Sequence, residues 1–230
     1  MSEEVRFGAA RALICDCDGV LVDSETIAAG VLIRELEARW PGLDVAPVLT
    51  PLLGQRIEQV LAGTARGLGR QLSELDVAAL RVSTERAARE APMVPGVVDA
   101  LRAIDLPKAC ASNSDTSYVR AVIARLGLVP QIGEHVYCAD SVARPKPAPD
   151  VYLAAARGLG VAPADCVVVE DSVAGVSAAH AAGMTVLGFV GGTHIGHGHD
   201  DALLAAGARE IFDDMTELPA RLADLIGYGD

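Results

Sequence analysis

Short apolar runs that alternate with helical segments constrain the fold of this chain more than any other feature of its sequence. The helix signals include Ser172, a good N-cap, before a stretch that ends at Gly183. Strands alternating with helices predict a parallel sheet wound by right-handed crossovers, which is an α/β, Rossmann-like core. The expected strands are Ala12–Cys15, Lys108–Ala111, His135–Cys138, Cys166–Val169, Met184–Val190 and, more weakly, Glu210–Phe212. The expected helices of the core are Asp115–Leu126, Ala148–Arg157 and Ser172–Ala182.

Residues 24–92 interrupt this alternation. They contain no convincing strand, and helical periodicity runs over Ile27–Trp40, Arg56–Leu68 and Leu75–Glu90. The stretch after them, Pro92-Met93-Val94-Pro95-Gly96, has the composition of a linker. We therefore expect a core formed by residues 1–23 and 93–230, with residues 24–92 as an inserted helical domain.

The charge and the hydropathy of the chain disfavour some classes of binding partner. The 230 residues carry a formal net charge of -12, which disfavours nucleic acid and anionic membranes as partners. No apolar run approaches the ~20 residues needed to span a bilayer. The acidic start, Met1-Ser2-Glu3-Glu4, lacks the basic region of a signal peptide. We expect a cytoplasmic protein that is a monomer or a weak homodimer.

The five cysteines indicate a reducing compartment. Four of them lie in the apolar runs, and Cys17 follows the first run. Their odd number and the lack of zinc-like spacing favour free, buried thiols over disulfides or a metal site.

An acidic motif, Asp16-Cys17-Asp18-Gly19, follows the first expected strand. Residues two apart in a strand face the same way, so Asp16 and Asp18 can point toward one pocket. Their repulsion is relieved by a divalent cation or by raising one pKa. A metal-bound Asp can act as a nucleophile, and a partly protonated one as a general acid.

Polar residues also follow the other expected strands. Ser112 and Asn113 follow the second strand, Lys146 lies in a Pro-rich loop after the third, and Glu170 and Asp171 follow the fourth. The carboxyl ends of parallel strands share one edge of the sheet, where ligands bind. A metal site, a nucleophile, a hydroxyl donor and a cation at one edge match the requirements of phosphoryl transfer.

Together these motifs resemble those of the haloacid dehalogenase superfamily of phosphohydrolases, in the branch with a helical cap after the first motif. Asp16–Ser24 and Val167–Gly183 are close to signatures of that superfamily. The resemblance is closest to phosphatases of sugar phosphates and phosphoglycolate, and to proteins similar to β-phosphoglucomutase. It implies that Asp16 attacks phosphorus and forms an aspartyl-phosphate. It also implies that Asp18 protonates the leaving alkoxide and then activates water.

The resemblance implies roles for the remaining motif residues as well. Ser112 and the amide of Asn113 would hold the phosphoryl oxygens, and Lys146 would neutralise charge on the phosphate and on Asp16. Mg²⁺ would be bound by Asp16, by the backbone carbonyl of Asp18 and by Asp171. Glu170 would either bind the metal or support a ligand.

The sequence constrains the reaction and the substrate less tightly than it constrains the family. Asp18 favours phosphoryl chemistry over dehalogenation, which proceeds in the superfamily without the second Asp. A phosphomutase of the β-phosphoglucomutase type remains an alternative, although the His that those enzymes carry after the first motif is absent here. A catalytically weak member that binds a partner is a second alternative. In the inserted domain, Gln55 and Arg56 resemble the superfamily's specificity loop, and the expected substrate is a small phosphorylated metabolite, either a sugar phosphate or a phospho-acid.

A histidine-rich segment follows the fifth expected strand. Residues 191–200 contain His194, His197 and His199 among several glycines. This spacing could bind a soft divalent metal, but the glycine content argues against a rigid set of ligands, so solvent-facing or structural roles are favoured.

Overall fold

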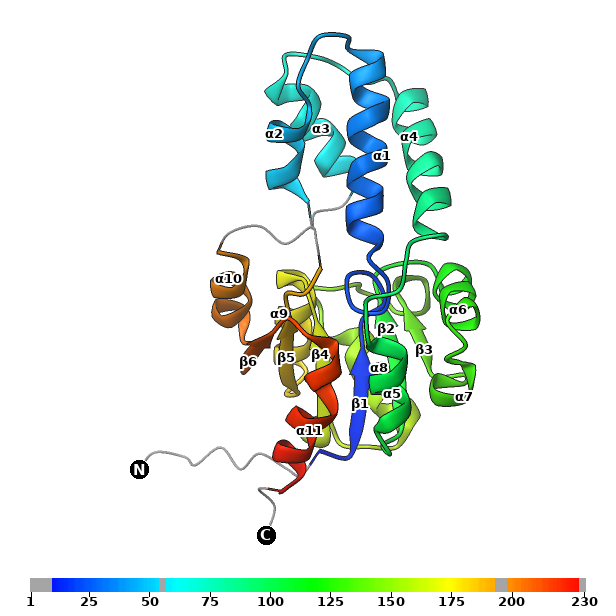
Figure 1. The fold of residues 1–230 in the computed structure, drawn as a ribbon, viewed down its shortest axis with the longest axis vertical. Coiled ribbons are helices and arrows are strands. Elements are labelled where there is room, and N and C mark those ends of the chain that lie inside the picture. The colour runs from blue at the N-terminus through cyan, green and yellow to red at the C-terminus, as the bar shows by residue number, and fades with distance from the viewer. Residues whose placement is uncertain (1–9, 54–56, 193–197, 228–230) are drawn as a thin grey trace. The chain divides into compact units, whose positions relative to one another are not determined.

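The computed structural model describes residues 10–53, 57–192 and 198–227. The chain forms two compact units, one from Met1–Val22 with Met93–Asp230 and one from Asp23–Pro92. We call them the α/β unit and the helical unit (Figure 1).

The α/β unit contains a six-stranded sheet in the order β3-β2-β1-β4-β5-β6, and every strand pair in it is parallel. The predicted α/β, Rossmann-like fold is confirmed. Successive strands extend the sheet in one direction from β1 to β3, whereas β4 pairs with the other side of β1, so the direction reverses at β1 and β4. Ligands of such sheets bind at the carboxyl ends of the strands at this reversal. The strands are β1 (Ala12–Cys15), β2 (Lys108–Ser112), β3 (Val136–Cys138), β4 (Cys166–Glu170), β5 (Thr185–Phe189) and β6 (Glu210–Phe212).

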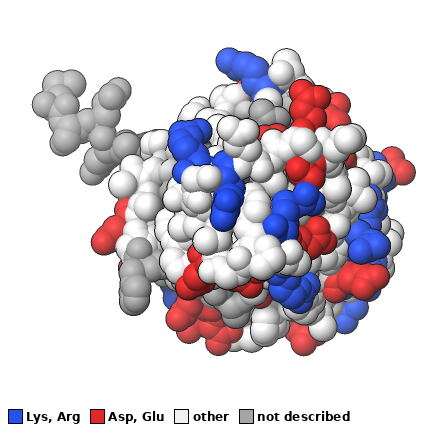
Figure 2. All heavy atoms as spheres, turned by 90° about the horizontal axis from the view of Figure 1, so that it is seen from above, with Lys and Arg blue, Asp and Glu red and all other residues white. Residues whose placement is uncertain are grey.

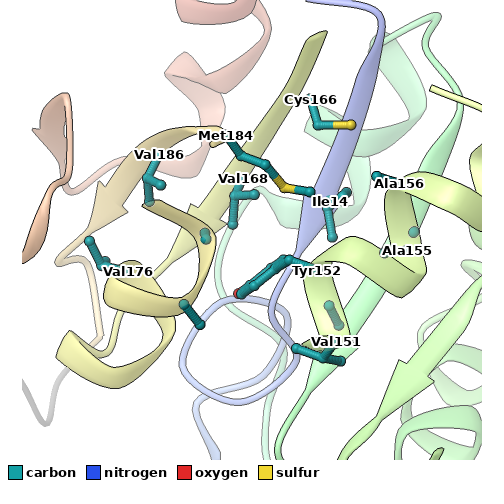
Figure 3. Close-up of a cluster of buried hydrophobic side chains, with 14 of the residues drawn as sticks. Ile14, Val151, Tyr152, Ala155, Ala156, Cys166, Val168, Val176, Met184 and Val186 are labelled. Atoms are coloured by element: carbon teal, nitrogen blue, oxygen red, sulfur yellow. The ribbon is translucent and has the colours of Figure 1, made fainter. Parts of the chain in front are cut away.

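Helices cover both faces of the sheet. On one face, α8, α9 and α10 pack against alternate strand residues such as Ile14 and Val168, with Tyr152 of α8 among them (Figure 3). Figure 1 shows α5 and α11 in front of the sheet. The helices are α5 (Val97–Ala103), α6 (Thr116–Arg125), α7 (Val129–Ile132), α8 (Asp150–Leu159), α9 (Val173–Ala181), α10 (His199–Ala206) and α11 (Leu218–Gly227).

Three of these helices, α6, α8 and α9, lie within two residues of the predicted ranges. The helices α5, α7, α10 and α11 were not predicted from the sequence. Of these, α5 and α7 have only seven and four residues, too few for a repeated apolar pattern.

The helical unit has its own apolar core. Leu36, Trp40, Leu61 and Leu80 are among the buried side chains that bring its helices together. The last helix starts with a capping box, in which Ser73 and Asp76 bond each other's backbone N–H. Its elements are α1 (Ser24–Arg39), α2 (Ala46–Leu49), a 3₁₀ turn (Thr50–Leu52), α3 (Ile57–Gly67) and α4 (Glu74–Ala88), of which α2 was not predicted.

The two segments that connect the units run side by side. Val22 and Met93 form an antiparallel bridge, and the Val94 N–H donates to the Leu21 carbonyl at 3.0 Å. On the side of the helical unit, the Asp23 N–H donates to the Pro92 carbonyl at 2.9 Å. The chain therefore leaves the α/β unit and returns to it at neighbouring points.

The core of the helical unit supplies a test of its packing. Leu36→Ala should lower the free energy of unfolding by about 2–5 kcal/mol, because this side chain is 0% exposed and its removal leaves a cavity. The matched control is Leu75→Ala in α4, where the side chain is 82% exposed and the change should be within about 0.5 kcal/mol. Denaturant titration measures both, and equal losses would contradict the assigned core.

Candidate active site

A buried lysine joins two carboxylates at the carboxyl ends of β1 and β4. The Nζ of Lys146 lies 3.0 Å from Oδ1 of Asp16 and 2.5 Å from Oε1 of Glu170. It also donates to the carbonyl of Ala111 in β2 at 2.9 Å. Burial opposes the charge of Lys146, but the two carboxylates outweigh it and raise its pKa. Lys146 is therefore a fixed positive charge that contacts three strand ends.

Glu170 is fully buried, and both of its oxygens are hydrogen-bonded. Oε1 accepts from Lys146 and from the Tyr152 hydroxyl at 2.7 Å, and Oε2 accepts from the N–H and hydroxyl of Ser172 at 3.0 Å each. Burial raises the pKa of Glu170, but Lys146 and the hydrogen bonds outweigh it, so the pKa lies below its usual value. A Cβ on Gly175 would lie 1.7 Å from Oε1, so the start of α9 needs glycine there.

Three buried acids form a candidate metal site. One ligand oxygen from each of Asp16, Glu170 and Asp171 lies within 4.8 Å of the others. Burial raises the pKa of Asp16 well above its usual value, and the charge of Glu170 raises it further despite Lys146. A divalent cation would offset this repulsion, and carboxylate oxygens are the ligands that Mg²⁺ prefers. The residues present thus fit a magnesium ion.

The loop after β1 is held by its own backbone. The strand ends at Cys15, as predicted, so Asp16 and Asp18 both lie in the loop and strand alternation does not set their directions. Instead, the loop closes when the Leu21 N–H donates to the Cys17 carbonyl at 2.8 Å. Gly19 has a φ of +77°, and a Cβ there would lie 1.7 Å from Oδ2 of Asp171, so this loop passes directly against that carboxylate.

Asp18 is held by hydroxyl groups from the segment after β2. The Ser114 hydroxyl donates to its Oδ2 at 2.6 Å, and the Tyr118 hydroxyl donates to its Oδ1 at 2.8 Å. The Ser112 hydroxyl lies 3.5 Å from Oδ2. Ser112 and Asp18, the proposed phosphate-binding and acid–base residues, are thus neighbours.

Asn113 bonds the loop that carries Lys146. Its Nδ2 donates to the Lys146 carbonyl at 3.1 Å, and its Oδ1 accepts from the Lys146 N–H at 2.8 Å. This two-way pairing holds the Lys146 backbone beside the end of β2, which is a use of the Asn113 side chain that the sequence did not suggest.

The structure describes only some of the remaining predicted residues. Gln55, Arg56, His194 and His197 lie outside the described residues. His199, at the start of α10, contacts the backbone carbonyl of Asp171 through Nε2 at 2.5 Å. A carbonyl only accepts hydrogen bonds, so Nε2 carries the proton in this contact.

Sequence reasoning missed four residues that support the site. Tyr152 and Tyr118 lie on buried faces of α8 and α6, where the apolar pattern suggests only packing. Ser114 had no assigned role, and Ser172 was predicted only to cap a helix. Its hydroxyl does accept from the Gly175 N–H at 3.0 Å, and it also donates to Glu170.

Comparison with known proteins fits this arrangement. The sequence profile of the haloacid dehalogenase-like hydrolases matches residues 10–183, and the chain belongs to this family. The CbbY protein of Rhodobacter capsulatus is 34% identical over 193 residues, which cover 77% of this chain and 84% of that protein. The predicted family is confirmed, and so is the predicted enzyme class, a hydrolase of phosphoric monoesters.

Two further proteins are similar over most of their length. The fructose-1-phosphate phosphatase YqaB of Escherichia coli is 34% identical over 183 residues, covering 75% of this chain and 92% of that protein. The crystal structure of a hydrolase of the haloacid dehalogenase family from Deinococcus radiodurans, with bound phosphate and sodium, has a TM-score of 0.81 to this chain. The two chains are 33% identical, and the match covers 95% of this chain and 97% of that one.

The described surface and helices bear on the expected partners. Figure 2 shows basic and acidic side chains interspersed on one face, rather than gathered in a single basic patch among the residues drawn in colour. Within the described ranges, no helix combines the length and apolar character needed to cross a bilayer.

The close approach of Gly19 to Asp171 gives a prediction about the site. Gly19→Ala should reduce turnover at least ~10-fold, because its Cβ would displace the Asp171 carboxylate, whereas positive φ alone costs about 1–2 kcal/mol of stability. Gly183→Ala is the matched control, since its φ is +79° and nothing lies within 4 Å of its Cβ position. Steady-state kinetics on folded protein separate the two, and equal activity of both variants would contradict the close approach.

Proposed function

We propose that this protein is a Mg²⁺-dependent phosphatase that hydrolyses a small phosphorylated metabolite, a sugar phosphate or a phospho-acid, through an aspartyl-phosphate on Asp16. The observation that carries the proposal is the contact of Lys146 with Asp16 at the end of β1, inside a cluster of buried acids. An acid in this setting can attack an anionic phosphate only if nearby cations offset the repulsion.

The first half-reaction would use Asp16 and Lys146. Oδ1 of Asp16 accepts from the Cys17 N–H at 2.7 Å and from Lys146 at 3.0 Å, so this oxygen is fixed and Oδ2 remains for attack on phosphorus. The Asp16–phosphorus bond forms as the bond to the leaving oxygen breaks. Lys146 offsets charge on the nucleophile, and Ser112 with the Asn113 amide would hold the phosphoryl oxygens.

Asp18 would move the protons. In its protonated form it gives a proton to the leaving oxygen, and as a carboxylate it then takes a proton from the water that cleaves the aspartyl-phosphate. Its position 3.5 Å from the Ser112 hydroxyl supports this assignment.

Asp16, Asp171 and the backbone carbonyl of Asp18 would hold Mg²⁺. Glu170 lies in the same acidic cluster, but four hydrogen bonds engage its oxygens, so its main role would be to fix Lys146. When bound, the metal supplies Lewis-acid stabilisation of charge on the phosphoryl oxygens.

We assign substrate choice to the helical unit, with residues 24–92 acting as a cap on a core of residues 1–23 and 93–230. Gln55 and Arg56 would read the part of the substrate beyond the phosphate. The similarity to a fructose-1-phosphate phosphatase supports a sugar phosphate as the substrate class. The five free thiols support a reducing, cytoplasmic setting.

We propose hydrolysis rather than phosphomutase activity because of a missing residue. Enzymes of the β-phosphoglucomutase type carry a His after the first motif, and this chain has no His before His135.

The metal assignment predicts a change in metal requirement. Asp171→Ala should raise the Mg²⁺ concentration for half-maximal activity at least ~10-fold, because one of few carboxylate ligands is lost. The control is Asp165→Ala at the opposite, amino end of β4, which should leave the requirement unchanged. Titration of activity with Mg²⁺ after chelation measures both, and unchanged dependence in Asp171→Ala would remove this residue from the site.

The substrate class is tested by phosphate release from a panel of small phosphorylated metabolites with Mg²⁺ present. We expect release from a narrow set of sugar phosphates or phospho-acids, and none with Asp16→Asn. The panel includes β-glucose 1-phosphate with product analysis. Its conversion to the 6-phosphate without phosphate release would show a mutase instead, and wild-type turnover by Asp16→Asn would contradict the nucleophile.

A further inference from the structure

We propose that Tyr118 is a positioning residue for Asp18 and fixes which oxygen of this carboxyl group serves in proton transfer; this inference rests on the proposed function. The Tyr118 hydroxyl donates to Oδ1 of Asp18 at 2.8 Å. Tyr118 lies in the first turn of α6, 100 residues further along the chain. None of the motif residues quoted from the sequence is Tyr118.

The two oxygens of Asp18 have different surroundings. Oδ2 accepts from the Ser114 hydroxyl at 2.6 Å and lies 3.5 Å from the Ser112 hydroxyl, on the side of the proposed phosphoryl site. Oδ1 is bonded by Tyr118. A donor fixed on Oδ1 sets the plane of the carboxyl group and turns Oδ2 toward Ser112.

Tyr118 is better suited to this task than a serine. Its side chain is 8% exposed and lies in the same buried helix face as Val119 and Val122. Packing of the ring holds the phenol oxygen in place, whereas a serine hydroxyl moves to another position when its single χ1 bond changes rotamer. The tyrosine therefore serves as a rigid anchor and Ser114 as an adjustable partner.

The contact also determines which oxygen faces the proposed phosphoryl site. Tyr118 holds Oδ1, whereas Oδ2 lies on the side of Ser112, so Oδ2 is the oxygen placed to exchange a proton with a phosphoryl group bound there. This proton goes to the leaving oxygen as its bond to phosphorus breaks. In the second step the same oxygen takes a proton from water. Tyr118 keeps its own proton throughout.

The test compares two leaving groups in Tyr118→Phe, which keeps the ring and removes the hydroxyl. An alkoxide must be protonated as it leaves, whereas p-nitrophenolate leaves without a proton. The value of kcat/KM reports the steps up to formation of the aspartyl-phosphate. For the best alkyl monoester of the metabolite panel, kcat/KM should fall about 10-fold, because general acid–base catalysis contributes ~10²–10⁴-fold and Tyr118 supports only a part of it. For p-nitrophenyl phosphate it should fall less than about threefold.

Two controls separate positioning from a loss of packing. Tyr137→Phe removes the hydroxyl of a tyrosine in β3 that contacts Nδ1 of His135 at 3.4 Å. This variant should leave kcat/KM unchanged for both esters. In the Asp18→Asn background, Tyr118→Phe should add less than about a twofold loss on the alkyl ester, because both changes act on one carboxyl group.

The outcomes distinguish this inference from the proposed function. Equal losses on both esters, no loss on either, or a full additional loss in the Asp18→Asn background would overturn the role of Tyr118 while the wild-type enzyme stays active. A wild-type protein that releases phosphate from no member of the metabolite panel and not from p-nitrophenyl phosphate would overturn the proposed function itself.

Discussion

The buried contact of Lys146 with Asp16 and Glu170 is the interaction on which the rest of the site depends. Both carboxylates are nearly or fully inaccessible to water, so neither could stay ionised without a cation. Removal of one partner of such a buried group typically costs about 3–5 kcal/mol. Each partner is held in turn: Glu170 by Tyr152 and Ser172, and the lysine loop by Asn113. Lys146 thus supplies a positive charge that phosphoryl transfer needs, and its contacts also connect the ends of three strands.

Much of this arrangement was predictable because it depends on local sequence. The expected strands correspond to the observed ones, and the motif residues follow them, because short apolar runs bounded by helix signals determine a parallel sheet. The order of strands then brings distant motifs to one edge. Strand alternation does not position Asp16 and Asp18, since the strand ends at Cys15, as predicted. Backbone bonds within the following loop position both acids instead.

Other features could not be predicted because they depend on distances across the fold. Tyr118 and Tyr152 lie on apolar helix faces, and their sequence patterns are those of core residues. Only the packed structure shows that each hydroxyl reaches a carboxylate. Asn113 was expected to act through its backbone amide, but its side chain bonds Lys146, which lies 33 residues away. Short helices such as α5 were missed because seven residues contain no full apolar repeat.

The paired segments at Val22 and Met93 have a consequence for how this chain can change. An insert whose two ends are neighbours closes a loop that the host would need anyway, and the entropy of loop closure grows only slowly with length. The helical unit has its own apolar core, made of side chains from its own helices and loops. Its sequence can therefore be exchanged, lengthened or redesigned as a cassette while the strand ends keep the same chemistry, and the two short connecting segments are the natural places to make the joins.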